Sequence, residues 1–268
     1  MATGYAIAGG AAGKQRLDHL ARVMAPSTSA LLDRAGITAG SKCVDVGCGG
    51  GHVTRELARR AGEGGWVVGI DADEQLLELA AADVVCAGLT NVEFRCQDAA
   101  RLDERKYDVA YARLLLSHVT DPERVLDAMV SSVRPGGVVV VEDLDISDFR
   151  CYPPIPAQDR LAEIYRETIR RRGGDPHIGQ SLPTRLHETG LQAIGVAITQ
   201  PSALQGDPKL VGPMALGAMT ASVVGEGVAD AEEVARIVDE LYQHAADPST
   251  LMGVPRIVQA WGAKPHDS

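Results

Sequence analysis

Residues 42–52 join a short apolar run to a cluster of glycines, and they read Lys42-Cys43-Val44-Asp45-Val46-Gly47-Cys48-Gly49-Gly50-Gly51-His52. The run from Lys42 to Val46 predicts a buried strand, and the glycines after it predict a tight turn. A helix is expected over residues 53–61. Glycines between a strand and a helix let the backbone come close to a ligand, and the first amides of the helix are available to polar or anionic groups. The stretch therefore predicts a strand–turn–helix unit that binds a ligand.

The same alternation of strand and helix continues after this unit. Strands are expected at residues 66–70, 92–95, 107–111 and 138–142, with helices at 74–87 and 122–133. Strands and helices that alternate with short connections are typical of a parallel sheet covered on both faces. The expected class is α/β.

The two ends of the chain predict helical additions to this sheet. Residues 14–36 predict helices broken at Pro26, which belong to an N-terminal helical cap over 1–36. Further helices are expected at 157–172, 182–188, 211–223 and 231–245, and strands at 191–199 and 255–263. The helical insertion at 201–250, between the last two strands, is expected to form a lid over the carboxyl edge of the sheet. We expect one domain over 1–268.

Composition restricts the possible partners and the compartment. The net charge of -10 argues against a broad nucleic-acid footprint, which needs a basic face to displace counterions from phosphates. The five cysteines form no CxxC pair, and an odd number suits a reducing compartment. The N-terminus does not resemble a signal peptide, and no apolar stretch approaches the ~18 residues of a membrane span. We expect a soluble, cytoplasmic protein that binds no membrane.

An acidic residue follows the second strand. The strand ends Val68-Gly69-Ile70-Asp71, and an acid at this place can hold a ribose diol through two hydrogen bonds. The alternative is that Asp71 is only a solvated cap for the helix from Glu74 onward. Together with the glycine turn, Asp71 predicts a site for a nucleoside-containing cofactor at the topological switch point of the sheet.

Two features favour S-adenosylmethionine (SAM) over a dinucleotide. In a GxGxxG fingerprint, Gly47 and Gly49 fit, but the third position is occupied by His52. Asp45 stands two residues before the first glycine, where a pyrophosphate would be repelled. SAM has no phosphate and carries an ammonium, a carboxylate and a sulfonium. NAD is the alternative cofactor.

From about residue 40 to 145 the chain resembles the class I SAM-dependent methyltransferases. The similarity is greatest to the small-molecule branch, which includes the ubiquinone/menaquinone C-methyltransferases and many natural-product methyltransferases. Four segments carry it: Val44–Gly51, Cys96–Ala99, Tyr107–Arg113 and the turn Val133-Arg134-Pro135-Gly136-Gly137. The resemblance implies a Rossmann-like, mostly parallel seven-stranded sheet with helices on both faces, and SAM as the cofactor.

The resemblance also implies the cofactor-binding residues. The turn Gly47-Cys48-Gly49 would contact the methionine part of SAM, and Asp45 would hold its ammonium directly or through water. Asp71 would bind the ribose, with Ala72 beside the adenine.

Two later segments complete this implied set. Asp98 would reach the adenine amino group, and Ala99 would supply a backbone amide. Arg113 ends the fourth strand, which passes the methionine and the methyl group.

The candidate for proton transfer is His118, whose neutral ring could accept a proton from a nucleophile. The competing interpretation is a structural histidine. His177 and Tyr152 are weaker candidates, and no dedicated base is required because the sulfonium already activates the methyl group. Arg16 could meet the SAM carboxylate, although an exposed helix arginine is the favoured interpretation.

No metal is predicted. Asp143-x-Asp145 lacks a clustered histidine, so a polar rim facing the substrate is at least as plausible as a metal pair.

The acceptor is expected to be a small molecule. Enzymes that methylate nucleic-acid amines carry an Asn/Asp-Pro-Pro-aromatic turn after the fourth strand, where this chain has Ala112-Arg113-Leu114-Leu115. We expect methyl transfer to an O, C or N atom of a metabolite, in specialised metabolism, by a monomer or homodimer. Segments 1–30, 113–118, 145–180 and 201–250 should enclose the acceptor. The alternatives are a cyclase or hydroxylase that uses SAM without methyl transfer, and an NAD-dependent oxidoreductase.

Overall fold

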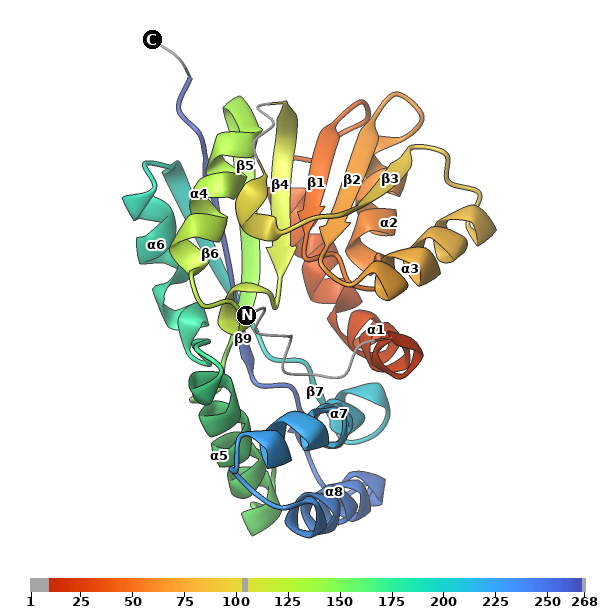
Figure 1. Ribbon diagram of the computed structural model, residues 1–268, viewed down its shortest axis with the longest axis vertical. Coiled ribbons are helices and arrows are strands. Elements are labelled where there is room, and N and C mark those ends of the chain that lie inside the picture. The colour runs from red at the N-terminus through yellow and green to blue at the C-terminus, as the bar shows by residue number, and fades with distance from the viewer. Residues whose placement is uncertain (1–9, 103–105, 267–268) are drawn as a thin grey trace.

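The computed structural model describes residues 10–102 and 106–266, and its centre is a seven-stranded sheet (Figure 1). The strands are β1 (Lys42–Val46), β2 (Trp66–Asp71), β3 (Val92–Cys96), β4 (Tyr107–Arg113), β5 (Val133–Asp145), β6 (Gln192–Thr199) and β9 (Arg256–Ala263). Their order is β3-β2-β1-β4-β5-β9-β6. β1 to β5 pair in parallel, whereas β9 runs antiparallel to both β5 and β6. This confirms the predicted α/β class and the mostly parallel sheet.

Helices cover both faces of the sheet, and each face has its own apolar core. On one face pack α2 (His52–Ala61) and the second half of α1 (Gly10–Arg34). On the other face pack α4 (Pro122–Ser132) and α6 (Leu182–Glu188). α3 (Glu74–Cys86) contacts β2 and β3 at the sheet's edge. Because both faces are covered, the inner strands carry apolar residues on both faces rather than alternating apolar with polar ones, apart from acids such as Asp45 and Glu142.

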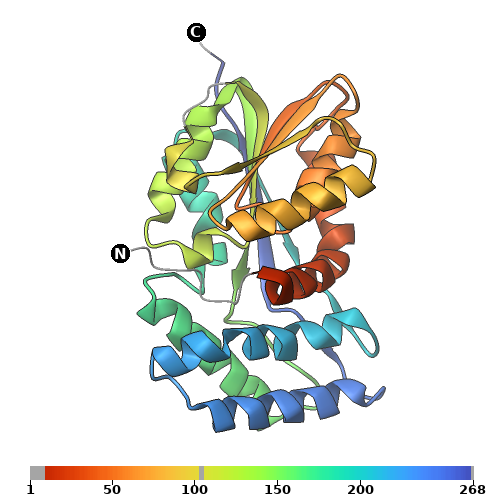
Figure 2. The ribbon, with the colours of Figure 1, turned by 45° about the vertical axis from the view of Figure 1, so that its right-hand side comes forward.

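A third core lies beyond the carboxyl ends of the parallel strands. It is formed by α5 (Pro156–Arg171), α7 (Val211–Gly225) and α8 (Ala231–Ala246), which gather at one end of the sheet (Figures 1 and 2). The insertion predicted at 201–250 contains a short strand β7 (Ser202–Ala203), the 3-10 turn η4 (Asp207–Leu210), α7 and α8; β8 (Met252–Gly253) follows. Within the described ranges, no helix is both long and apolar enough to cross a bilayer. That the insertion acts as a lid, and that 1–268 is one domain, remain predictions.

The expected helix break at Pro26 is wrong, because α1 runs without interruption from Gly10 to Arg34. A proline inside a helix lacks the N–H of one backbone bond and usually kinks the helix. Here packing compensates, since Met24 and Leu31 on either side of Pro26 are fully buried. Residues 1–9 of the predicted cap lie outside the described residues.

A buried carboxylate fastens α1 to the sheet. Glu142 on β5 is fully buried and accepts hydrogen bonds from Thr28 Oγ1 (2.6 Å), Gln259 Nε2 (2.8 Å) and the Tyr111 hydroxyl. Buried charges are tolerated when they are fully hydrogen-bonded. This network fixes the position of α1 next to the carboxyl ends of β1 and β4.

Candidate functional site

The register of three strands brings the predicted site residues to one edge. Val46 of β1 pairs with Ile70 of β2 on one side and with Ala112 of β4 on the other. The residues that come next, Gly47, Asp71 and Arg113, therefore lie side by side at the carboxyl edge of the sheet. In the strand order, β2 and β4 flank β1 on opposite sides, so this edge is a topological switch point, where α/β sheets bind ligands.

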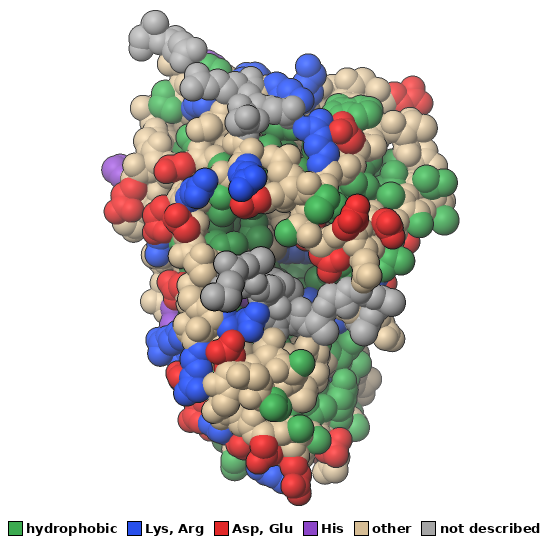
Figure 3. All heavy atoms as spheres, in the orientation of Figure 1, with side chains coloured by type: hydrophobic (Ala, Val, Ile, Leu, Met, Phe, Trp, Pro, Cys, Tyr) green, Lys and Arg blue, Asp and Glu red, His purple; other side chains and the backbone are tan. Residues whose placement is uncertain are grey.

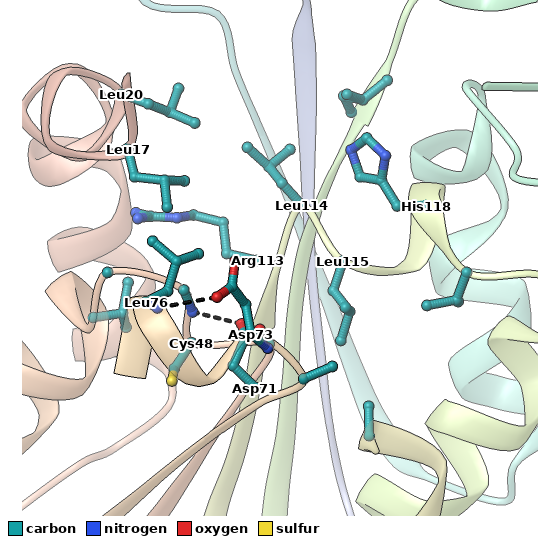
Figure 4. A pocket seen from close by; sticks show the side chains of 18 of the residues that line it. Leu17, Leu20, Cys48, Asp71, Asp73, Leu76, Arg113, Leu114, Leu115 and His118 are labelled. Carbon is teal, nitrogen blue, oxygen red and sulfur yellow. Dashed lines mark hydrogen bonds between the residues drawn. The ribbon is translucent and has the colours of Figure 1, made fainter. Parts of the chain in front are cut away.

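The glycine turn is held to β2 by backbone hydrogen bonds. Gly47 N and Cys48 N both donate to the carbonyl of Ile70, at 2.8 and 2.9 Å, and Gly49 N donates to Asp71 Oδ2 at 2.8 Å. Gly47 and Gly49 have φ of 69° and 49°, the left-handed region that favours glycine. The turn and Asp71 thus form one rigid unit (Figure 4).

The interpretation of Asp71 as a helix cap is wrong. α3 is capped by Asp73, whose side chain accepts from Leu76 N at 3.1 Å. Asp71 instead accepts from Gly49 N and, at 2.9 Å, from Asp73 N. Each carboxylate oxygen has two lone-pair sites, so Asp71 keeps acceptor capacity toward a diol in the cavity.

Asp45 is a buried acid beside the turn. It is 2% exposed and accepts a hydrogen bond from Thr54 Oγ1 at 2.6 Å. Burial raises the pKa of Asp45 to about 6, although the Thr54 hydrogen bond and the charge of Arg113 oppose the rise. A cationic ligand next to Asp45 would stabilise its ionised form.

Arg113 supplies a positive charge at the same edge. Its Nη1 donates to Thr28 Oγ1 at 3.3 Å, and it forms no ion pair with any carboxylate that the structure describes. Figure 4 shows its guanidinium directed toward Leu17 of α1. Leu17 also covers the glycine turn, since a Cβ built on Gly49 would lie 3.2 Å from its Cδ1.

Asp98 and Ala99 follow β3 at the far end of the site. Asp98 caps the 3-10 turn η1 (Ala99–Arg101) by accepting from Ala100 N at 2.9 Å. Its side chain is 60% exposed, so it remains accessible to a ligand.

The predicted cofactor-binding residues and His118 line one cavity of about 1280 Å³. They are Asp45, Gly47, Cys48, Gly49, Asp71, Ala72, Asp98, Ala99, Arg113 and His118. Pockets for a single ligand are roughly 300–1,000 Å³, so this cavity has room for a cofactor and a second molecule. Apolar side chains are visible within a depression near the centre of the face drawn in Figure 3.

The cavity has two differently built parts. The first part, which we call the cofactor half after its predicted role, is formed by the strand ends from Asp45 to Ala99 together with Arg113. The second part, which we call the acceptor half after its predicted role, continues toward the helical layer and is mainly apolar. Its apolar lining is Leu20, Leu114, Leu144, Ile146, Phe149, Leu161, Val211, Ala215, Val254 and Ile257. The expected enclosing segments supply most of this lining, but the contribution of residues 254–257 was not predicted.

His118 lies on the acceptor side, across the cavity from α1 (Figure 4). Burial, assisted by the positive charges of Arg16 and Arg172, lowers the pKa of His118 to about 3. The ring is therefore neutral near pH 7, but it is a weak proton acceptor, because a general base works best with a pKa near the working pH. The ring lies at 76° to the ring of Tyr165, with 6.5 Å between the centroids.

The favoured interpretation of Arg16 as an exposed residue is wrong. Arg16 is 8% exposed and lines the cavity. The burial of Arg16 could not be predicted from the sequence pattern, because Arg16 follows Lys14 and Gln15 and such a polar run is typical of an exposed helix face.

His177 and Tyr152 do not line the cavity. His177 Nδ1 lies 3.2 Å from Asp145 and 3.0 Å from Ser147, so a single ring nitrogen makes both contacts and no Ser-His-Asp relay exists. Tyr152 is 71% exposed.

The Asp143-x-Asp145 pair serves the backbone and the sheet instead of a ligand. Asp143 accepts from Ser117 N at 3.2 Å, and Asp145 pairs with Arg256. Over the described part of the chain, no cluster of three His, Cys, Asp or Glu residues suits a metal.

Comparison with known proteins identifies the family of the chain. Residues 37–184 match a family model described as a methyltransferase domain. The ubiquinone biosynthesis O-methyltransferase of Acinetobacter baumannii (strain ACICU) is 36% identical over 110 residues, which are 40% of this chain and 45% of that protein. The chain thus matches less than half the length of this curated relative.

Two solved structures share the fold over most of the chain. Haemonchus contortus phosphoethanolamine N-methyltransferase 2, in complex with SAM, has a TM-score of 0.58 at 17% identity, covering 90% of this chain and 53% of that one. The [4+2]-cyclase SpnF has a TM-score of 0.57 at 20% identity, covering 90% of this chain and 82% of that one. At these identities the likeness concerns the fold alone.

Proposed function

Because the chain belongs to the SAM-dependent methyltransferase domain family, we propose that it transfers a methyl group from SAM to an O, C or N atom of a small metabolite. One observation carries the proposal. Asp45 and Asp71, with the glycine turn between them, line the same cavity, and that cavity continues into an apolar half large enough for a second molecule.

The charges of the cofactor half suit SAM. We assign Asp45 to the ammonium, Arg113 to the carboxylate and Asp71 to the ribose, with Asp98 and Ala99 at the adenine. Five acidic side chains line this half: Asp45, Asp71, Asp73, Glu74 and Asp98. A pyrophosphate would be repelled by this field, whereas a cationic sulfonium is attracted to it. NAD is therefore disfavoured.

When bound, SAM supplies a methyl group on a positively charged sulfur. The chain's contribution is to orient the two reactants and to exclude water. Leu114 and Leu115, which follow β4, lie where the two halves meet and can keep the reaction site dry. His118 is neutral and can accept a hydrogen bond from the nucleophile without taking full charge. Much of the rate would then come from holding nucleophile, carbon and sulfur in line.

Calorimetry with SAM and with NAD tests the cofactor assignment. SAM should bind and NAD should not; NAD binding without SAM binding would overturn it. Incubation with methyl-labelled SAM and metabolite extracts then tests the transfer. Label is expected in a small organic product, and label that never leaves SAM in the presence of a consumed substrate would exclude methyl transfer.

A second candidate is a reaction that uses this fold and SAM without moving the methyl group. The likeness in fold to the [4+2]-cyclase SpnF is the observation that motivates it. Mass analysis of the converted substrate separates the two: methyl transfer adds 14 mass units, cyclisation adds none and hydroxylation adds 16.

We further propose that the acceptor belongs to specialised metabolism and that the protein acts in the cytoplasm as a monomer or homodimer. The apolar acceptor half supports the first proposal. The five cysteines are all free, as in proteins of reducing compartments, which supports the second. Light scattering of the purified protein would determine its oligomeric state.

A further inference from the structure

Arg16 is a buried cation for which the described chain provides no anion. It is 8% exposed, its Nε is buried without a hydrogen-bond partner, and no described carboxylate forms an ion pair with it. The neighbouring cations of α1 are paired: Lys14 contacts Asp18 and Asp83, both at 2.8 Å, and Arg22 contacts Asp207 at 2.9 Å.

An unpaired buried charge is costly, so proteins pair such groups with an opposite charge or neutralise them. Arginine cannot be neutralised at physiological pH. The same region shows the usual solution at Arg172, whose Nη1 lies 3.1 Å from Glu226. Arg16 lacks such a partner and faces a cavity, which is the arrangement expected of a group whose anion arrives with a ligand.

The position of Arg16 points to the acceptor half. Leu20, one helical turn further along α1, contacts the core that includes Leu144, Ile146 and Phe149, and residues four apart share a helix face. The positive charge of Arg16 acts on His118 across the cavity. The cofactor half has its own cation in Arg113, which forms no ion pair with a described carboxylate.

We propose that Arg16 binds a carboxylate of the methyl acceptor, so that the acceptor is an organic acid with an apolar body. This inference rests on the proposed function. The planar guanidinium matches a carboxylate through two parallel hydrogen bonds, and the low-polarity walls strengthen the pair. The surrounding leucine, isoleucine and valine side chains accommodate the apolar body.

A carboxylate could come from two sources, the acceptor or the methionine part of SAM. Calorimetry separates them with Arg16→Gln and Arg16→Lys, using Arg22→Gln as the control on the same helix. Two probe pairs of equal shape are titrated into protein with and without S-adenosylhomocysteine: 2-naphthoate against 2-naphthamide, and decanoate against decanamide. S-adenosylhomocysteine is titrated separately into each variant.

The expected result is that at least one acid binds the wild type roughly 10-fold or more tightly than its amide, as a hydrogen-bonded ion pair implies. Arg16→Gln should remove that preference, Arg16→Lys should keep part of it, and Arg22→Gln should keep all of it. The affinity for S-adenosylhomocysteine should stay within about twofold in all variants, well below the tenfold change that ~1.4 kcal/mol produces.

Three results would overturn the inference: no acid preference in the wild type, a preference that survives Arg16→Gln, or a loss of S-adenosylhomocysteine binding in that variant. Thermal unfolding gives an independent readout. Removal of an unpaired buried charge should raise the melting temperature of the ligand-free protein, and a lowered value would contradict the claim that Arg16 lacks an anion. If the wild type binds neither SAM nor its product, the proposed function fails, whereas the titrations without cofactor still test Arg16.

Discussion

The two halves of the cavity are built in opposite ways. The cofactor half comes from the ends of neighbouring strands. Its turn is hydrogen-bonded to Ile70 and Asp71, and Asp45 is hydrogen-bonded to Thr54 of α2, all within about thirty residues of chain. The acceptor half collects side chains from α1, α5, α7 and residues 254–257, and it holds a positive charge that no described acid balances. A common cofactor can be bound by a local, polar motif, whereas a particular acceptor must be matched by surfaces from distant parts of the chain.

The sharpest test of the cofactor half is Asp71→Ala. It removes the acceptor for Gly49 N and Asp73 N as well as the proposed ribose contact. The affinity for SAM should fall about 100-fold, since hydrogen bonds to a charged group contribute about 1.5–3 kcal/mol each. Calorimetry measures this, with Asp71→Asn as the control that preserves shape. A loss below threefold would show that Asp71 is not part of the cofactor site.

Gly51→Ala tests how tightly the turn is packed. Gly51 has φ of 70°, and a Cβ there would lie 2.9 Å from Ala80 Cβ. Gly88 has a φ of 67° with nothing within 4 Å, so Gly88→Ala carries the same backbone strain without the clash. The free energy of unfolding should fall by about 1–3 kcal/mol more for Gly51→Ala, the usual effect of overpacking. Equal losses in denaturant titrations would mean that the turn can relax.

The pH dependence of SAM binding tests Asp45. The pKa of Asp45 is raised from 3.8 to about 6 in the folded protein. Its contribution to the stability of the ligand-free fold is therefore complete below pH 3.8 and is lost as the pH rises through about 6. The ammonium of SAM needs the ionised carboxylate, so affinity should rise with pH up to about 6 and then level off. Below that pH the slope should approach about tenfold per unit. Asp45→Asn should remove this pH dependence of the affinity, even though Asp143, whose pKa is also raised to about 6, is retained. If the pH dependence persists in Asp45→Asn, it comes from another group.

The smallest effect is expected at His118 in the acceptor half. With a pKa of about 3, the ring is a poor general base, and His118→Gln should lower the transfer rate by less than about tenfold. The pH–rate profile between 5 and 8 should keep its shape. A loss of about 10²–10⁴-fold, the usual contribution of a general base, would show that the bound acceptor makes His118 a dedicated base.

Much of the cofactor half could be predicted because its signals are local. A strand that ends in glycines and an acid after the next strand are adjacent features, and parallel pairing necessarily brings their ends together. The cap of α4 is equally local, since Asp121 accepts from Arg124 N and Pro122 occupies the first turn. α6 was predicted with its observed bounds, Leu182–Glu188, as a short helix before Gly190.

The failures concern long-range packing. The effect of Pro26 on α1 depended on the cores that hold both sides of the helix. The core around Met24 comes mainly from residues 144–257, and the core around Leu31 mainly from residues 43–140. The burial of Arg16 depended on tertiary packing around α1, which contacts α3 and α7. Neither could be derived from neighbouring residues.

The sequence by itself determined the class of fold and was enough to predict the residues of the cofactor half, since strand periodicity, glycine turns and strand-end acids act over a few residues. Tertiary structure alone decided which side chains line the acceptor half, that Arg16 is buried without an anion from the described residues, and that His118 is a weak base. The physical reason is that burial and charge balance are sums over all neighbours in space, and only the folded chain brings those neighbours together.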